Sequence, residues 1–282
     1  MAISFLLGIL IITILGLFLG FGLAFAAKIF HVKIDENVEK IIELLPGVNC
    51  GGCGYQGCAV YAEAIVKKEE EINLCAPGGQ KVIDEIGSIL GKKSVGKVRY
   101  VAKIQCLGDD AIALKDYKFN GDEDCYAVSS FFGGEKACKY GCIGKGNCIR
   151  VCPVNAIKRD KLNRVWIDSD ECIGCERCLT VCPTKVIKMF PIDGGYFVAC
   201  SSPEMGKKVK EVCKKGCIGC KICEKITGDP DRIIVVDNLA KINYNSKVDL
   251  RSAALKCPAD TIVPIKNQKL YMKNNKEYKI EN

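Results

Sequence analysis

Histidine and tryptophan are nearly absent from this chain of 282 residues, which has one of each, His31 and Trp166. A single histidine excludes any metal site that is built from two or more imidazoles. It also argues against a Ser-His-Asp triad, because His31 borders the N-terminal apolar run. The sequence therefore directs attention away from the common hydrolase sites.

Charge is absent from residues 2–27, which form an unbroken apolar run. As a helix this run would be about 39 Å long, and the hydrocarbon core of a bilayer is about 30 Å thick. A cleaved signal peptide would need a positive segment before a short apolar core, but here the run begins at residue 2. A buried helix of this length that is apolar on every face would be unusual. We therefore expect an uncleaved transmembrane anchor over residues 1–30.

Lysines follow the apolar run at positions 28, 33 and 40, and no charged side chain precedes it. The positive-inside rule then places the rest of the chain in the cytoplasm, behind a single span of the cell membrane. The run holds no ionisable side chain, so we expect it to anchor the protein and not to conduct ions.

The net charge of +8 is concentrated in the second half of the chain. Residues 28–125 carry −3, residues 126–200 carry +4 and residues 201–282 carry +7. Such a half could face nucleic acid, anionic lipid or an acidic protein, or could be a solvated basic surface. Its lysines are scattered, and we expect no nucleic acid as a partner.

Cysteine is abundant, with 20 residues. In a reducing cytoplasm these residues are expected to bind metal and not to form disulfides. From residue 138 onward the cysteine pattern repeats: Cys138-x₃-Cys142-Ile-Gly matches Cys213-x₃-Cys217-Ile-Gly, and Cys-Pro-x₃-Ile occurs three times. Each Cys-Pro should lead into a short strand or hairpin. Repeats this short and rich in cysteine need a metal to supply folding energy.

The spacing predicts an α+β chain with small modules. We expect a transmembrane anchor over 1–30, a helical four-cysteine module over 34–92, a linking β-containing segment over 97–137, a two-cluster ferredoxin-like domain over 138–200, and a degenerate third ferredoxin-like module over 201–282. Helices are expected near 35–45, 58–68 and 80–90, a strand at 98–105, a linker at 91–94, and a tight turn at Asn120-Gly121.

The clearest metal motif is Cys172-x₂-Cys175-x₂-Cys178-x₃-Cys182-Pro, the run typical of bacterial ferredoxins. Three cysteines at this spacing wrap one face of a [4Fe–4S] cluster, and the fourth points away to a second cluster. The third expected ligand set is therefore Cys152, Cys172, Cys175 and Cys178. Zinc is the alternative, but zinc sites usually pair two separated Cys-x₂-Cys units.

The partner half departs from this run, because Lys145 occupies a position where ferredoxins have cysteine. Cys138 is the nearest spare thiol, so the second expected set is Cys138, Cys142, Cys148 and Cys182, with Cys138 uncertain. The fourth set is Cys217, Cys220, Cys223 and Cys257. Thr227 stands where a further ligand would be, which suggests that the third module has lost its second cluster.

The first set is Cys50, Cys53, Cys58 and Cys75, in which a zinc knot is a more serious alternative. Its loop contains Gly52-x-Gly54-x₂-Gly57, but no strand is expected before it, so we reject a dinucleotide site. The thiols left over are Cys106, Cys125, Cys200 and Cys213. They could form a fifth cluster from distant loops, or some could be buried structural thiols. Because Cys213 aligns with Cys138, these two could instead share one role.

An apolar anchor, then Cys50-Gly-Gly-Cys53-Gly-Tyr-Gln-Gly-Cys58, Cys75-Ala-Pro-Gly-Gly and a ferredoxin module together resemble the RnfB family, the B component of the Rnf complex, over nearly the whole chain. The stretches 106–142 and 198–217 resemble a longer form of that component. The resemblance implies a membrane complex that passes electrons between reduced ferredoxin and NAD⁺, coupled to Na⁺ or H⁺ transport. It implies soluble ferredoxin and other Rnf subunits as partners.

The residues alone predict a membrane-anchored electron carrier with four [4Fe–4S] clusters and a possible fifth. Iron–sulfur clusters move single electrons, and we find no flavin or nicotinamide site, so hydride chemistry is expected on another subunit. Two alternatives remain open: an anchored ferredoxin subunit of a different respiratory or reductase complex, and a zinc-structured membrane adaptor without a redox role.

Overall fold

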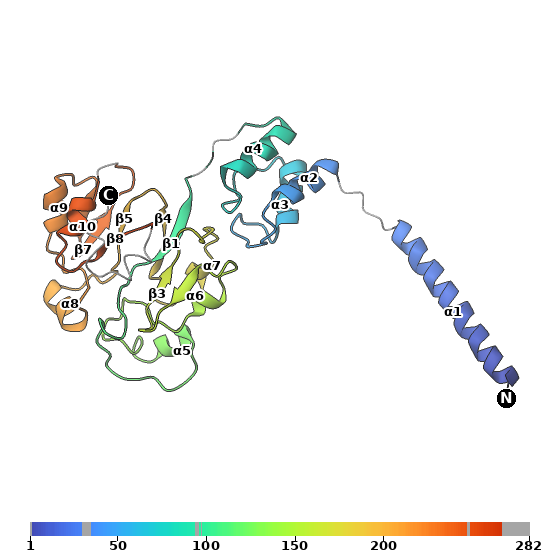
Figure 1. Cartoon of the computed structure of the whole chain (residues 1–282), viewed down its shortest axis with the longest axis horizontal. Coiled ribbons are helices and arrows are strands. Elements are labelled where there is room, and N and C mark those ends of the chain that lie inside the picture. The colour runs from blue at the N-terminus through green and yellow to red at the C-terminus, as the bar shows by residue number, and fades with distance from the viewer. Residues whose placement is uncertain (1, 30–34, 94–95, 97, 247–248, 267–282) are drawn as a thin grey trace.

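The computed structural model describes residues 2–29, 35–93, 96, 98–246 and 249–266. His31, Lys33 and Ser94 lie outside the described residues. The N-terminal apolar run forms one helix, α1 (Ala2–Ile29), which lies apart from the other elements in Figure 1. It contains one stretch that is long and apolar enough to cross a membrane, Leu7–Ala26, and this stretch is not buried by the rest of the chain.

Three helices form the N-terminal module: α2 (Glu36–Leu44), α3 (Cys58–Lys67) and α4 (Gly79–Leu90). Asp35 caps α2 by accepting a hydrogen bond from the amide of Asn37 at 2.8 Å. The apolar faces of the three helices meet in a small core that includes Ile41, Tyr61 and Ile86, all almost fully buried. The helices thereby hold the two loops that carry the first four cysteines.

The central module consists of β1 (Tyr100–Ile104), α5 (Cys125–Ser130), α6 (Asn147–Arg150), β2 (Ile157–Arg159), β3 (Val165–Ile167), α7 (Arg177–Thr180) and β4 (Ile187–Pro191). β2 and β3 form an antiparallel hairpin, and β1 pairs antiparallel with β4, with Ala102 opposite Met189. The segment expected to link two domains therefore supplies the outer strand of the central module. Asn120-Gly121 is a bend and no hairpin turn, because the residues on either side of it do not pair as strands.

The C-terminal module repeats this plan with β5 (Tyr196–Val198), α8 (Gly206–Val212), α9 (Ile222–Thr227), β6 (Ile233–Val236), β7 (Leu239–Ile242), α10 (Arg251–Leu255) and β8 (Ile262–Pro264). β6 and β7 form the hairpin, and β5 pairs antiparallel with β8. β5 lies a few residues before the boundary expected at 201. Figure 1 shows the C-terminal module beside the central module, on the side away from α1.

Each of the three Cys-Pro motifs leads into a strand, as expected: β2, β4 and β8. The cysteines belong to the cores that these strands build. Cys148, Cys172 and Cys178 are buried among the apolar side chains of the central module, and Cys217 and Cys223 among those of the C-terminal module. The modules therefore bury sulfur together with small numbers of aliphatic residues, which is the packing of a fold organised around bound metal.

Candidate metal centres

The first four-cysteine set surrounds a pocket in the N-terminal module. Cys50, Cys53 and Cys58 come from the loop between α2 and α3, and Cys75 comes from the loop before α4. Tyr61 fixes the second loop, because its hydroxyl donates to the carbonyl of Glu71 at 2.7 Å and accepts from the amide of Leu74 at 3.1 Å. The element before this loop is the helix α2, so the Gly-rich stretch lacks the strand that a dinucleotide-binding turn requires.

The third set surrounds a pocket in the central module, with Cys172, Cys175 and Cys178 on one loop and Cys152 on another. Two backbone amides donate to its sulfurs: that of Ala102 to Cys172 Sγ at 3.4 Å and that of Ala156 to Cys152 Sγ at 3.3 Å. Amide hydrogen bonds to ligand sulfurs are one of the means by which proteins set cluster potentials. The structure thus brings together the four thiols expected here.

The structure groups the cysteines of the second expected set differently: Cys125, and not Cys138, lies with Cys142, Cys148 and Cys182. Burial, and after it the neighbouring Cys125 and Cys182, raise the pKa of the Cys148 thiol to about 12. Cys142 also lies near Cys148. The four thiols Cys125, Cys142, Cys148 and Cys182 are called the Cys125 set below.

Polar contacts between α5 and the helices α6 and α7 place Cys125 in this set. The Asn147 side chain accepts from the amide of Cys125 at 2.8 Å and donates to Asp124 at 2.7 Å. The hydroxyl of Tyr126 donates to the carbonyl of Thr180 at 3.1 Å. α5 therefore carries a cysteine to the position that a conventional ferredoxin run would supply from within its own loop.

Lys145, which stands at that ligand position, has become part of an ion pair. Its Nζ lies 3.0 Å from Glu123 and 3.5 Å from the buried carboxylate of Glu135. The lysine side chain thus neutralises a buried acid beside the site, and the thiol arrives from a separate helix. The thiol that the structure places beside Cys148 is Cys125, where the sequence suggested Cys138.

The fourth set, Cys217, Cys220, Cys223 and Cys257, surrounds a pocket in the C-terminal module. Cys220 is exposed and Cys217 and Cys223 are buried. Thr227 ends α9, where its hydroxyl donates to the carbonyls of Cys223 and Glu224 at 2.9 and 3.1 Å. It therefore closes the helix at the position where a further ligand would be.

The remaining thiols, Cys106, Cys138, Cys200 and Cys213, line one pocket between the central and C-terminal modules. They are called the Cys106 set below. The expected fifth set contained Cys125 in place of Cys138, so the structure exchanges these two residues. The signal in the sequence was the alignment of Cys138 with Cys213, which outweighs the shorter distance along the chain from Cys138 to Cys142.

Within the described ranges, no group of three or more His, Cys, Asp or Glu side chains is placed to hold a single metal ion. A zinc ion with bonds of about 2.3 Å would bring four sulfurs within about 4 Å of one another. The thiols instead stand around pockets, such as the one of 340 Å³ at the first set. The thiols therefore do not form a ready four-sulfur site for a single zinc ion in the described part of the chain.

Two family models match the chain where these loops lie. Residues 45–77 match the model described as "Putative Fe-S cluster", and residues 138–189 match the model described as "4Fe-4S dicluster domain". The first range covers the cysteines of the N-terminal module, and the second covers most of the central module. The chain therefore carries iron–sulfur clusters.

Curated relatives match nearly the whole chain. The B component of a proton-translocating ferredoxin:NAD(+) oxidoreductase complex from Clostridium ljungdahlii is 36% identical over 260 residues, which cover 91% of each chain. The B component of an ion-translocating oxidoreductase complex from Methanosarcina acetivorans is 36% identical over 88% of this chain and 94% of its own.

A third relative is the B component of a Na(+)-translocating ferredoxin:NAD(+) oxidoreductase complex from Acetobacterium woodii, 34% identical over 89% of this chain and 75% of its own. Its resemblance, like the other two, extends across all three modules. With the matching iron–sulfur models, the agreement identifies the chain as a membrane-associated component of an oxidoreductase complex, with other subunits as partners. The chain belongs to the RnfB family, and it is an iron–sulfur electron-transfer subunit of the Rnf complex.

Proposed function

We propose that this chain takes single electrons from reduced ferredoxin and passes them to other subunits of an ion-translocating complex. In the complex, NAD⁺ is reduced on another subunit and the electron flow drives Na⁺ or H⁺ across the membrane. Bound [4Fe–4S] clusters supply one-electron chemistry without covalent bonds to substrate. The residues of this chain hold the clusters, exclude water from them and set their potentials.

The observation that carries the proposal is the contact between sets of thiols that belong to different modules. A Cβ at Gly52, in the loop of the first set, would lie 3.3 Å from Cys175 Cα, so the first set lies beside the third. Burial, and then Cys172 and Cys148, raise the pKa of Cys178 to about 12, so the third set lies beside the Cys125 set. Sets that adjoin one another in this way form a route for electrons.

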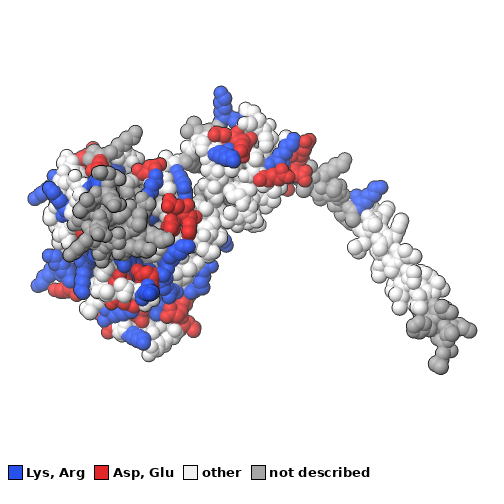
Figure 2. Space-filling model, in the orientation of Figure 1, with Lys and Arg blue, Asp and Glu red and all other residues white. Residues whose placement is uncertain are grey.

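The direction of flow follows from charge and anchoring. Soluble ferredoxins are typically acidic, and the lysines of the C-terminal half form a basic surface. Figure 2 shows Lys and Arg side chains gathered over α8. Lys207, Lys210 and Lys214 are exposed there, whereas Lys208 pairs with Glu204 at 3.0 Å and the half-buried Lys215 lies 3.7 Å from Asp260. We place ferredoxin at this end and the membrane partners at the N-terminal module, next to α1.

Reversing the charge of Lys207, Lys210 and Lys214 to glutamate should slow cluster reduction by reduced ferredoxin on the order of tenfold at low salt. The effect should shrink at high salt, because the Debye length falls with ionic strength. Stopped-flow absorbance near 400 nm would follow the reduction in the intact complex, prepared without oxygen. A small artificial donor should reduce the variant at the normal rate.

A matched control reverses three exposed lysines of the N-terminal module, Lys81, Lys92 and Lys93, which changes the net charge equally at the other end. Equal slowing in both variants would contradict docking at α8. Failure of reduced ferredoxin to reduce the clusters of the unaltered complex would contradict the proposed function itself and favour a different respiratory or reductase complex.

We also propose that α1 spans the membrane once, with the N-terminus outside and the cysteine-rich part in the cytoplasm. Lys28 and the later lysines follow the apolar stretch, which supports this orientation. Protease added to sealed, right-side-out vesicles should leave the cysteine-rich part intact and should digest it after the vesicles are opened. Digestion in sealed vesicles would reverse the orientation.

A further inference from the structure

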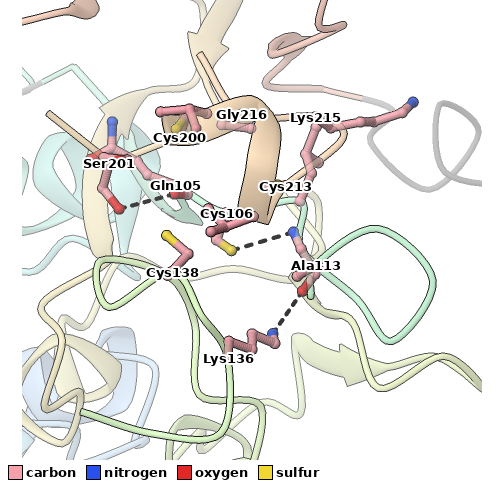
Figure 3. Close-up of a pocket in the computed structure, with 17 residues that line it drawn as sticks. Gln105, Cys106, Ala113, Lys136, Cys138, Cys200, Ser201, Cys213, Lys215 and Gly216 are labelled. Carbon is pink, nitrogen blue, oxygen red and sulfur yellow. Dashed lines mark hydrogen bonds between the residues drawn. The ribbon is translucent and has the colours of Figure 1, made fainter. Parts of the chain in front are cut away.

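Four cysteines from four separate segments meet where the central and C-terminal modules touch (Figure 3). Cys106 follows β1, Cys138 lies in the loop before α6, Cys200 follows β5, and Cys213 follows α8. They line a pocket with an empty volume of about 440 Å³. Neither family model covers Cys106, Cys200 or Cys213, because the matched ranges are 45–77 and 138–189.

Residues 112–115 act as a spacer that aligns two of the four segments. On one side, the amide of Leu114 donates to the carbonyl of Val212 at 2.9 Å, and that of Lys214 donates to Ile112 at 3.1 Å, which fixes Cys213. On the other side, the amide of Ala137 donates to the carbonyl of Leu114 at 2.9 Å, which fixes Cys138. The two thiols that align in the sequence repeat are thus held by one strip of backbone.

Ser201 joins the other two segments. Its hydroxyl donates to the carbonyl of Tyr140 at 2.6 Å and contacts that of Gln105 at 3.3 Å, so the loops of Cys138, Cys106 and Cys200 are tied at one residue. Gly141 permits the close approach, because a Cβ there would lie 3.2 Å from Cys106 Sγ and 3.8 Å from Cys138 Sγ. The backbone is therefore built around the sulfurs.

Backbone amides lie near all four sulfurs. The amide of Gly108 donates to Cys106 Sγ at 3.3 Å. The amides of Tyr140 and Gly141 lie near Cys138, those of Ser202 and Cys217 near Cys200, and that of Lys215 near Cys213. Thiols that merely fill a core do not need such donors, whereas sulfurs that carry the negative charge of a cluster do.

The surroundings would not favour four free thiolates. Cys200 is buried and Cys106, Cys138 and Cys213 are only partly exposed, so four negative charges here would repel one another with little screening by solvent. A positively charged iron–sulfur core among the sulfurs would allow all four to ionise together. Within the described part of the chain, these thiols do not converge on a point where a single ion could sit.

We propose that Cys106, Cys138, Cys200 and Cys213 bind a further [4Fe–4S] cluster at this junction between modules. The position of the site between two other cysteine sets indicates a role in electron transfer between the modules. Cys106 lies near Cys142 of the Cys125 set, and Cys200 lies near Cys217 of the fourth set. The cluster therefore connects the C-terminal module to the central module, accepting one electron from one side and releasing one to the other. The binding site rests on the geometry alone, and the connecting role rests on the proposed function.

Iron counting on paired variants tests the ligand set directly. Cys106→Ala and Cys138→Ala, each in the full chain prepared without oxygen, should lower the content by about four iron and four sulfide per chain. The double variant should lose no more than either single variant, because both residues serve one cluster. If the two residues belong to different clusters, as sequence spacing suggests, the double variant loses twice as much.

Partial loss of iron in a single variant can also be interpreted. Three remaining cysteines can retain a three-iron cluster, whose oxidised form gives an EPR signal that an oxidised [4Fe–4S] cluster lacks. Such a signal in both single variants supports the site. Val209→Ala is the matched control, since Val209 lines the same pocket without a thiol, and the variant should keep all its iron. Unchanged iron and EPR spectra in both cysteine variants, or zinc in place of iron, would overturn the proposal.

The connecting role has its own measurement. In Cys106→Ala, reduced ferredoxin should still reduce the fourth-set cluster, but the clusters of the central module should be reduced far more slowly in rapid-freeze EPR. Dithionite, which reaches each cluster directly, should reduce both modules at equilibrium. Normal transfer in a variant that has lost the junction cluster would contradict the role and leave the metal site intact. A failure of ferredoxin to act as donor would show up separately, because iron content and dithionite reduction do not depend on it.

Discussion

A leucine in place of Gly52 should reduce electron flow out of the central module to a small fraction of normal, without loss of iron. Gly52 lies in the loop of the first set, and a Cβ at this position would be 3.3 Å from Cys175 Cα and 3.5 Å from the Cys175 carbonyl oxygen. Those atoms belong to the backbone of the third set, which cannot turn aside as a flexible side chain would. A larger residue must therefore separate the two modules.

Electron tunnelling weakens steeply with the distance between clusters, so even a small separation is costly. We expect a graded series in which Gly52→Ala has a modest effect and Gly52→Leu a severe one. Rapid-freeze EPR of the intact complex would time the reduction of the first-set cluster after the third-set cluster. Dithionite should still reduce both clusters fully at equilibrium, which separates slow transfer from a damaged site.

Ala59→Leu provides the control, because it adds the same side chain at an exposed position of α3 in the same module. It should leave the transfer rate unchanged. Equal rates in Gly52→Leu and the unaltered protein would show that the first and third sets do not exchange electrons directly across this contact.

Replacement of Lys136 by methionine should lower the midpoint potentials of two clusters at once. Lys136 is buried, and its Nζ donates to the carbonyls of Gly108 and Cys142, both at 2.8 Å. Lys136 lines the pocket of the Cys106 set (Figure 3). One of the two carbonyls that it contacts belongs to Cys142, a member of the Cys125 set. A cation between two clusters stabilises the reduced form of each, since reduction adds negative charge.

Loss of a unit charge at such a site should change each cluster by about 1–3 kcal/mol, which for one electron is roughly 40–130 mV. Redox titration followed by EPR would measure both potentials. The two carbonyls would also lose their donor, so we expect some loss of stability, on the order of 1–3 kcal/mol.

Lys139→Met is a suitable control because Lys139 lies three residues away and its Nζ, which is more exposed, is 3.1 Å from Asp116. Removing it should shift neither potential by more than a small fraction of the Lys136 effect. Equal shifts of the midpoint potentials in the two variants would indicate a general effect of surface charge. A shift in the potential of one cluster alone would contradict the position of Lys136 between two clusters.

Sequence spacing was informative where ligands are close together along the chain. The first, third and fourth sets each take three cysteines from one short loop, so local spacing identifies which thiols can meet. The Cys125 and Cys106 sets draw on segments whose meeting depends on tertiary contacts. Asn147 holds Cys125 in place, and a strip of backbone near Ala113 holds Cys138 and Cys213. No spacing rule encodes these contacts.

The pairing of β1 and of β5 could not be predicted from the sequence, because the paired strands are also far apart along the chain. β1 looked like part of a linker because its partner, β4, lies more than eighty residues later. The same applies to β5, whose partner β8 comes much later in the chain. Helices were easier to predict, because their periodicity and caps are local, as with Asp35 before α2.

A cluster at the junction between the central and C-terminal modules would cross-link the two modules as well as transfer electrons between them. A cluster bound to Cys106 and Cys213 closes a loop of roughly 100 residues, and by the entropy of loop closure such a cross-link is worth about 5 kcal/mol. Insertion of this cofactor can only follow the folding of both modules, so it would mark the completion of assembly. Oxygen that destroys it would remove this cross-link and leave the two modules joined by their shared apolar core, which includes Phe197 and Val263. Increased proteolysis near residue 200 would then report oxidative damage.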